Sequence, residues 1–269
     1  MDGTTEAAAR GPMLMIHGVG CTGTVWSHMA GAFRARGFTV ETPTLKADLR
    51  TVEAPPAALL SVTLSDYIDE AEGWARAMKA FSGQWPVLVG HSMGGLIVQK
   101  LLERGVGRAG VLVTPAAPAD VNTGLSPAVV FTFANILLAR DMPAKAHKVW
   151  RTGFNWGVLN RTPRARHAEI HAAAVHDPGR VYQALGMPDK DPHRAAFVDE
   201  NRIEVPVLTI GAAHDRATPI AGVRKTAAKY ARVGGEYREY AKNAHWIIDE
   251  PGTDGVITDI DQWLKSKSI

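Results

Sequence analysis

The segment Gly90–Gly94 (GHSMG) constrains this chain more than any other feature of its sequence. It comes directly after the apolar run Pro86–Val89 and directly before a helical pattern that runs from Met93 to Arg104. A serine at such a sharp strand-to-helix turn adopts a strained backbone conformation, and neighbouring chain passes close to the flanking glycines. The segment therefore predicts a tight turn that exposes the Ser92 hydroxyl at the N-terminus of a helix, where the helix dipole favours negative charge.

Short apolar runs alternate along the whole chain with longer segments of helical spacing, which predicts βαβ units. One helical segment covers residues 63–82, and Thr63 and Asp66 at its start have the spacing of a capping box. Others begin near Val25, Ile220 and Val256. We expect an α/β fold with a mainly parallel, doubly wound sheet of about six strands. The expected strands are Met13–Ile16, Phe38–Leu45, Pro86–Val89, Gly110–Val113, Val205–Ile210 and Tyr237–Tyr240.

The region between the fourth and fifth of these strands has a different pattern. Helical segments follow one another there without convincing strands, and the basic stretch Arg161–Arg166 indicates a solvated face. A chain of 269 residues fits one α/β domain with an insertion. We therefore predict a core domain formed by residues 1–119 and 202–269, with residues 120–201 inserted as a helical cap.

Composition narrows the classes of partner and compartment. The formal net charge is only +3, and the basic residues are scattered, which argues against a nucleic-acid partner. The single cysteine, Cys21, cannot form an internal disulfide, as is typical of a cytoplasmic protein. Residues 1–12 do not have the pattern of an export signal, and no run reaches 18 uninterrupted apolar residues. We expect a cytoplasmic protein without a membrane span, and the oligomeric state stays open.

The chain resembles the α/β-hydrolase superfamily over nearly its whole length. Beside the GHSMG turn, the resemblance rests on a His-Gly pair after the first strand, in the segment Ile16–Gly20 (IHGVG). It implies an α/β-hydrolase fold in which Ser92 is the nucleophile. It also implies that the backbone N–H groups of Val19 and Met93 form an oxyanion hole, while His17 has a structural role.

The same resemblance implies the two partners of the serine. The segment after the strand Val205–Ile210 looks like the family's acid loop, so Asp215 is the expected acid, with Asp120 as a weaker alternative. His245 follows the last strand and is the expected general base, because an imidazole titrates near neutral pH. The order Ser92, Asp215, His245 matches the family.

This triad predicts a serine hydrolase that cleaves a carboxylic ester, thioester or lactone of a small, largely apolar substrate through an acyl-enzyme. The chemistry requires no cofactor. A metal site at His167, His171 and His176, placed on one cap helix, is not expected, since no further ligand pattern accompanies them. Cys21 is expected to be a buried thiol and no nucleophile. The expected pocket residues are Phe131, Phe133, Ile136, Leu137, Trp150, Phe154, Trp156 and Trp246.

Other activities share the triad and stay open. A carbon-carbon bond hydrolase or an acyltransferase would differ in its pocket, and cofactor-free perhydrolysis would be a side reaction of an esterase. A small-ligand receptor that keeps the triad is the alternative from another class. The short N-terminus also resembles the plant methylesterase and hydroxynitrile lyase branch. The lyases, however, carry a threonine in place of Gly18 and a lysine in place of Trp246, so cyanohydrin cleavage is not expected.

Overall fold

Six parallel strands form the central sheet, in the spatial order β2-β1-β3-β4-β7-β8. The computed structural model describes residues 9–121 and 126–269. The direction in which successive strands are added reverses between the neighbours β1 and β3. In open α/β sheets, ligands bind at such switch points. The strands are β1 (Gly11–Ile16), β2 (Phe38–Glu41), β3 (Val87–His91), β4 (Ala109–Val113), β7 (Val207–Ala212) and β8 (Glu236–Tyr240).

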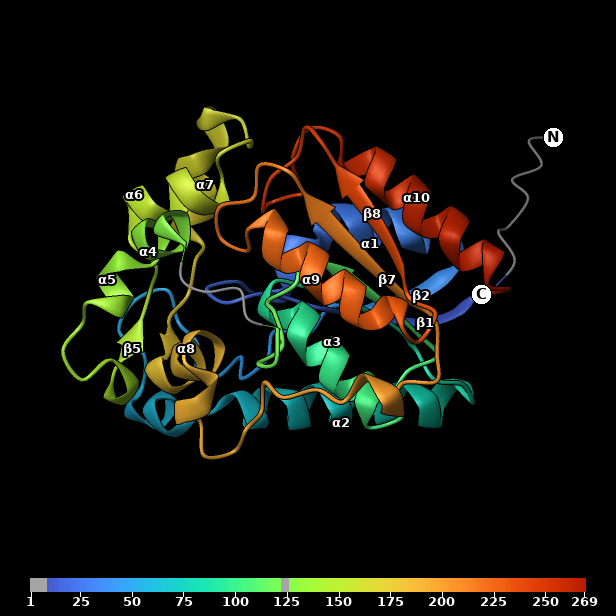
Figure 1. The fold of residues 1–269 in the computed structure, drawn as a ribbon, viewed down its shortest axis with the longest axis horizontal. Coiled ribbons are helices and arrows are strands. Elements are labelled where there is room, and N and C mark those ends of the chain that lie inside the picture. The colour runs from blue at the N-terminus through green and yellow to red at the C-terminus, as the bar shows by residue number, and fades with distance from the viewer. Residues whose placement is uncertain (1–8, 122–125) are drawn as a thin grey trace.

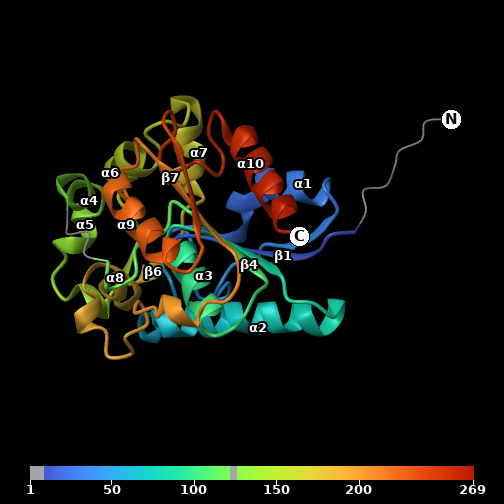
Figure 2. The same ribbon diagram turned by 45° about the vertical axis from the view of Figure 1, so that its right-hand side comes forward.

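Helices cover both faces of this sheet (Figures 1 and 2). Met13 and Met15 point into the core cluster formed with α1 (Ser27–Arg34) and α10 (Thr253–Ser266). The alternate residues Leu14 and Ile16 point into the cluster formed with the helices of the other face. Because successive strand residues face opposite sides, a sheet buried on both sides needs continuous apolar runs, as the sequence has. The helices of the second face are α2 (Leu64–Ser82), α3 (Met93–Glu103) and α9 (Ile220–Ala231).

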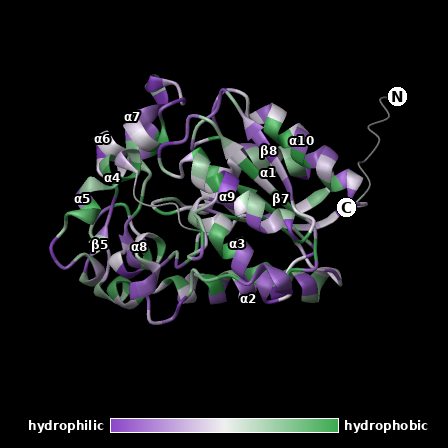
Figure 3. Ribbon diagram, viewed as in Figure 1, coloured by the Kyte–Doolittle hydropathy of each residue, from purple (hydrophilic) through white to green (hydrophobic). Residues whose placement is uncertain are grey.

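The helix α2 has the ends that its sequence predicts. The Thr63 side chain accepts a hydrogen bond from the Asp66 backbone N–H, and the Asp66 carboxylate accepts one from the Thr63 N–H at 2.8 Å. Gly83 ends the helix with φ +78°, a conformation that favours glycine. Hydrophobic and hydrophilic residues alternate along the helix (Figure 3), since only its inner side is buried.

Short elements make up the segment between β4 and β7, which we call the cap. Figure 1 shows its helices grouped at the end of the sheet that lies away from the C-terminus. The helices are α4 (Pro127–Thr132), α5 (Ala134–Leu137), α6 (Arg151–Gly153), α7 (His167–Ala172) and α8 (Gly179–Gly186). Two strands, β5 (Ala146–His147) and β6 (Asp177–Pro178), pair antiparallel.

Several expectations need correction at this level of detail. The cap contains a strand pair that its sequence does not indicate, because two-residue strands have no periodicity. His176 lies beyond the end of α7, so the three histidines do not share a helix. The strand β2 ends at Glu41 and does not continue to Leu45.

Other expectations are not tested by these elements. The domain boundaries at residues 119 and 202 stay predictions. The expected lack of an export signal concerns residues 1–12, of which residues 1–8 lie outside the described part. Within the ranges 9–121 and 126–269, no helix is both long and apolar enough to cross a membrane.

Candidate active site

Ser92 sits at the turn between β3 and α3 with φ 55° and ψ −120°, a conformation that non-glycine residues rarely adopt. The two flanking glycines are required by close backbone contacts. A Cβ atom on Gly90 would lie 2.2 Å from the Gly94 carbonyl oxygen, and one on Gly94 would lie 2.0 Å from the Ile16 carbonyl oxygen. The strained turn is therefore as the sequence predicts. The residue is more enclosed than expected, because only 8% of its surface is exposed.

Asp215 and His245 are joined by a hydrogen bond of 2.8 Å between Asp215 Oδ2 and His245 Nδ1. Because the carboxylate only accepts, Nδ1 carries the proton and Nε2 is left as an acceptor. Among the described residues, nothing hydrogen-bonds to His245 Nε2 or to the Ser92 hydroxyl. Contacts of this kind commonly tighten only when a substrate is bound. The structure thus pairs Asp215 with His245, and the ring of His91, the residue before Ser92, lies 4.7 Å from the His245 ring between centroids.

The acid loop fixes the Asp215 carboxylate from its other side. Asp215 Oδ1 accepts hydrogen bonds from the backbone N–H groups of Ala217 and Thr218, both at 2.8 Å. The Thr218 hydroxyl lies 2.8 Å from Asp215 Oδ2 and 3.2 Å from His245 Nδ1. Asp120, the alternative acid, lies elsewhere and forms an ion pair with Lys229. The geometry favours Asp215.

His91 holds the backbone of His245, a role that the sequence analysis did not assign. His91 Nε2 donates to the His245 carbonyl oxygen at 2.8 Å, and the two rings are 4.7 Å apart between centroids. Burial lowers the pKa of His91 well below its ordinary value, and the charge of His245 lowers it further, so the ring stays neutral. Its place inside the GHSMG turn is the sequence signal that could have pointed to it.

Glu250 supports the segment before His245 from the other end of its loop. Its Oε1 accepts hydrogen bonds from the Ala244 N–H at 2.6 Å and from Asn243 Nδ2 at 3.0 Å. Burial raises the pKa of this carboxyl. The segment directly before His245 is thereby tied to the end of its own loop.

Two backbone N–H groups beside Ser92 are free to bind an oxygen atom. Within the described part of the chain, neither the Val19 N–H nor the Met93 N–H donates a hydrogen bond. Gly18 lies directly against the serine, since a Cβ atom there would be 2.9 Å from Ser92 Cβ. The loop of residues 18–21, which we call the Gly18 loop, thus borders Ser92.

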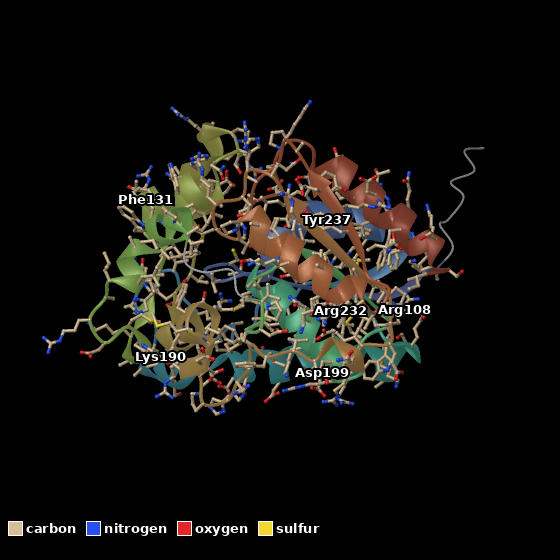
Figure 4. All side chains as sticks on the ribbon, viewed as in Figure 1. Arg108, Phe131, Lys190, Asp199, Arg232 and Tyr237 are labelled. Atoms are coloured by element: carbon tan, nitrogen blue, oxygen red, sulfur yellow. The ribbon has the colours of Figure 1, made fainter. Side chains whose placement is uncertain are left out.

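The expected pocket residues fall into two groups. Ile136, Phe154 and Trp246 are buried, with Phe133 and Trp150 packed against the same cluster. Phe131 and Trp156 are 40% and 38% exposed on the cap, in ring contact with each other (Figure 4 labels Phe131), and Leu137 is half-buried. A cavity of about 150 Å³ lies between the Gly18 loop and α7 and is lined in part by Cys21, Phe154, Ile170 and Trp246. The pocket assignment stays a prediction.

The remaining candidates behave as ordinary structural residues. Nε2 of His167 and of His171 are hydrogen-bonded to the carbonyl oxygens of Thr162 and Val149. Across residues 9–121 and 126–269, no group of three His, Cys, Asp or Glu side chains is arranged to hold a metal ion. Burial raises the pKa of the Cys21 thiol to about 12, so it stays protonated.

A parallel sheet with a strained serine after β3, and an Asp-His pair after the later strands β7 and β8, defines the α/β-hydrolase class. The family model described as the alpha/beta hydrolase family matches residues 13–255. The chain belongs to this family, and the expected fold class is confirmed.

Individual relatives agree with this assignment. A monoacylglycerol lipase of Mycolicibacterium smegmatis is 25% identical over 272 residues, which cover 98% of this chain and 91% of the lipase. A methylesterase from Arabidopsis has a TM-score of 0.71 at 13% identity, covering 95% of this chain and 99% of that one. A monoacylglycerol lipase of Paleococcus ferrophilus has a TM-score of 0.68 at 20% identity, covering 97% and 96%. The family and the lipase of Mycolicibacterium smegmatis support a carboxylic ester hydrolase, and the two solved structures show the same fold.

Proposed function

We propose that the chain hydrolyses carboxylic esters of small, largely apolar substrates through an acyl-enzyme on Ser92. His245 Nε2 takes the proton of the Ser92 hydroxyl as its oxygen attacks the ester carbonyl carbon, and then gives that proton to the departing alcohol oxygen. A water molecule, deprotonated by the same nitrogen, releases the carboxylic acid and restores the serine. Asp215 holds the ring in the required tautomer and stabilises its protonated form. These steps use no cofactor.

The Val19 and Met93 N–H groups serve as the oxyanion hole in this proposal. Neither donates to another acceptor in residues 9–121 and 126–269, and both belong to segments that border Ser92. Removing one donor from such a site commonly costs roughly 100-fold to 1000-fold in kcat.

The hydrogen bond between Asp215 and His245, beside a serine in a strained turn, is the observation that carries the proposal. The printed activities of the relatives, lipase and methylesterase, support esters as the substrate class. The cap residues expected to line the pocket are mostly apolar, which supports an apolar acyl or alcohol group.

A series of p-nitrophenyl esters from acetate to dodecanoate tests the proposal, with the unaltered chain compared with Ser92→Ala. We expect release of p-nitrophenol that depends on Ser92, and the preferred acyl length measures the pocket. Absence of turnover with every ester would contradict it. A carbon-carbon bond hydrolase, an acyltransferase or a receptor for a small ligand would then be tested next by substrate profiling and ligand binding.

A further inference from the structure

A second cluster of buried polar side chains lies against the Gly18 loop, centred on Asp177 in strand β6 of the cap. Asp177 and Arg50 are both fully buried as an ion pair. Arg50 Nε donates to Asp177 Oδ1 at 2.9 Å and Arg50 Nη2 to Oδ2 at 3.0 Å. The Tyr67 hydroxyl donates to Oδ1 at 2.7 Å, and the Gly20 backbone N–H donates to Oδ2. Each carboxylate oxygen therefore accepts two hydrogen bonds.

The same arginine extends the cluster to His17. Arg50 Nη1 lies 3.2 Å from His17 Nε2, and the Leu45 backbone N–H donates to that nitrogen at 3.0 Å. Because Nε2 accepts, the proton sits on Nδ1, which donates to the Gly18 carbonyl oxygen at 2.9 Å. Burial, with the Arg50 charge as a second cause, lowers the pKa of His17 to about 3, so the ring is neutral near neutral pH, and its hydrogen bonds set the tautomer.

The bond from His17 to Gly18 fixes the direction of an N–H group. The Gly18 carbonyl and the Val19 N–H belong to one planar trans peptide, so they point in opposite directions. Holding the Gly18 oxygen on one side therefore aims the Val19 N–H at the other. The next peptides are held as well, because the Gly20 N–H is bound by Asp177 and the Gly20 oxygen accepts from the Val175 N–H at 2.9 Å.

We propose that Asp177 is a positioning residue for the oxyanion hole, acting through Arg50 and His17 on the peptide that carries the Val19 N–H. The inference rests on the proposed function. It makes the cap part of the catalytic machinery, although Asp177 touches no reacting atom. Since an oxyanion forms only in the transition state, the contribution belongs to kcat and leaves KM nearly unchanged.

Asp177→Asn tests this relay. We expect kcat for a p-nitrophenyl ester to fall roughly 100-fold with KM within about threefold, since one oxyanion donor is misaimed. The second readout compares an alkyl trifluoromethyl ketone with the methyl ketone of the same chain. The Ser92 oxygen adds to the carbonyl carbon of the trifluoromethyl ketone, the serine proton passes to His245, and the ketone oxygen becomes an oxyanion. The affinity of the trifluoromethyl ketone should fall about as much as kcat, while the methyl ketone affinity stays within about threefold.

Glu200→Gln is the matched control, because it also converts a buried, ion-paired carboxylate into an amide. Glu200 pairs with Lys229 at 2.6 Å and with Arg232, away from the Gly18 loop. This variant should keep kcat and both inhibitor affinities even where its thermal stability falls. Should Asp177→Asn not fold, Tyr67→Phe removes a single donor without any change of charge, and we expect kcat to fall about threefold to tenfold with an unchanged KM.

The outcomes separate this inference from the proposed function. Full kcat in a folded Asp177→Asn chain, or in Tyr67→Phe where the first does not fold, would overturn the inference and leave the esterase intact. Equal weakening of both ketones would reduce Asp177 to a structural role. No ester turnover by the unaltered chain, with no labelling of Ser92 by a fluorophosphonate, would overturn the proposed function and this inference together.

Discussion

His17 and His245 each lie in a buried polar cluster with an aspartate, but the two rings are bound differently. Both nitrogens of His17 are occupied, one by Gly18 and the other by Leu45 and Arg50. On His245 only Nδ1 is bound, and in the described part of the chain Nε2 is free. The first ring can only hold a conformation, whereas the second can also exchange a proton.

The two carboxylates differ in the same sense. Asp177 and Asp215 each accept four hydrogen bonds, but the charge of Asp177 is neutralised by Arg50. Within the described part of the chain, Asp215 pairs only with His245, which is cationic only when protonated. A carboxylate without a permanent counter-charge stabilises an imidazolium that forms during a reaction. The comparison teaches that a histidine and an aspartate are suited to proton transfer only where one ring nitrogen is left without a hydrogen bond and the carboxylate has no permanent counter-charge.

The largest test of the reactive cluster replaces its two reacting groups. Ser92→Ala and His245→Ala should each lower kcat roughly 10⁴-fold or more, because the proposed nucleophile and base act as a unit. The double variant should cost little beyond either single one. Initial rates on the best p-nitrophenyl ester measure this, with circular dichroism as the control for folding. Additive losses in the double variant would mean that the two residues act separately.

The next test asks which carboxylate serves His245. Asp215→Asn should lower kcat by roughly 10³-fold to 10⁴-fold, because the amide favours the wrong tautomer of the ring. Asp120→Asn, which alters a partly exposed ion pair with Lys229, should stay within about twofold. The two kcat values on one ester decide the point. An inactive Asp120→Asn beside an active Asp215→Asn would reverse the assignment.

The smallest expected effect concerns the closed cluster and pH. The pKa of His17 is about 3 in the fold and about 6.5 in an unfolded chain, so between these values the unfolded state binds more protons and stability rises with pH. The neutral side chain of His17→Gln removes this contribution. Between pH 6 and pH 4.5, the free energy of unfolding of the His17→Gln variant should therefore fall less steeply with decreasing pH than that of the unaltered chain. The difference should be up to about 1.4 kcal/mol per pH unit.

Urea denaturation across this pH range gives the two slopes. His214→Gln, which changes an exposed ring, is the matched control. Parallel slopes for His17→Gln and the unaltered chain would show that His17 does not stay neutral in the fold.

The core was more predictable from sequence than the cap. The junction of β3 and α3 could be placed because apolar periodicity, glycine spacing and a helix stop agree over about twenty residues. The order Ser92, Asp215, His245 could be assigned because each residue follows a strand of one parallel sheet. In the cap, helices of three to eight residues and strands of two carry little periodic signal. The pocket residues there could only be chosen because they are apolar or aromatic, and their positions in space could not be assigned.

By itself, the sequence determined the sheet and the strained turn at Ser92, since these depend on local patterns, and chain order pointed to Asp215 and His245 as the proposed partners of the serine. Only the tertiary structure decided which polar groups meet. Asp177 lies 127 positions from Arg50 in the chain, and nothing local marks the pair. His91 and Thr218 gain their contacts with His245 in the same way, from distant segments. Hydrogen bonds and ion pairs need atoms within about 3 Å, and that proximity comes from packing of the whole fold.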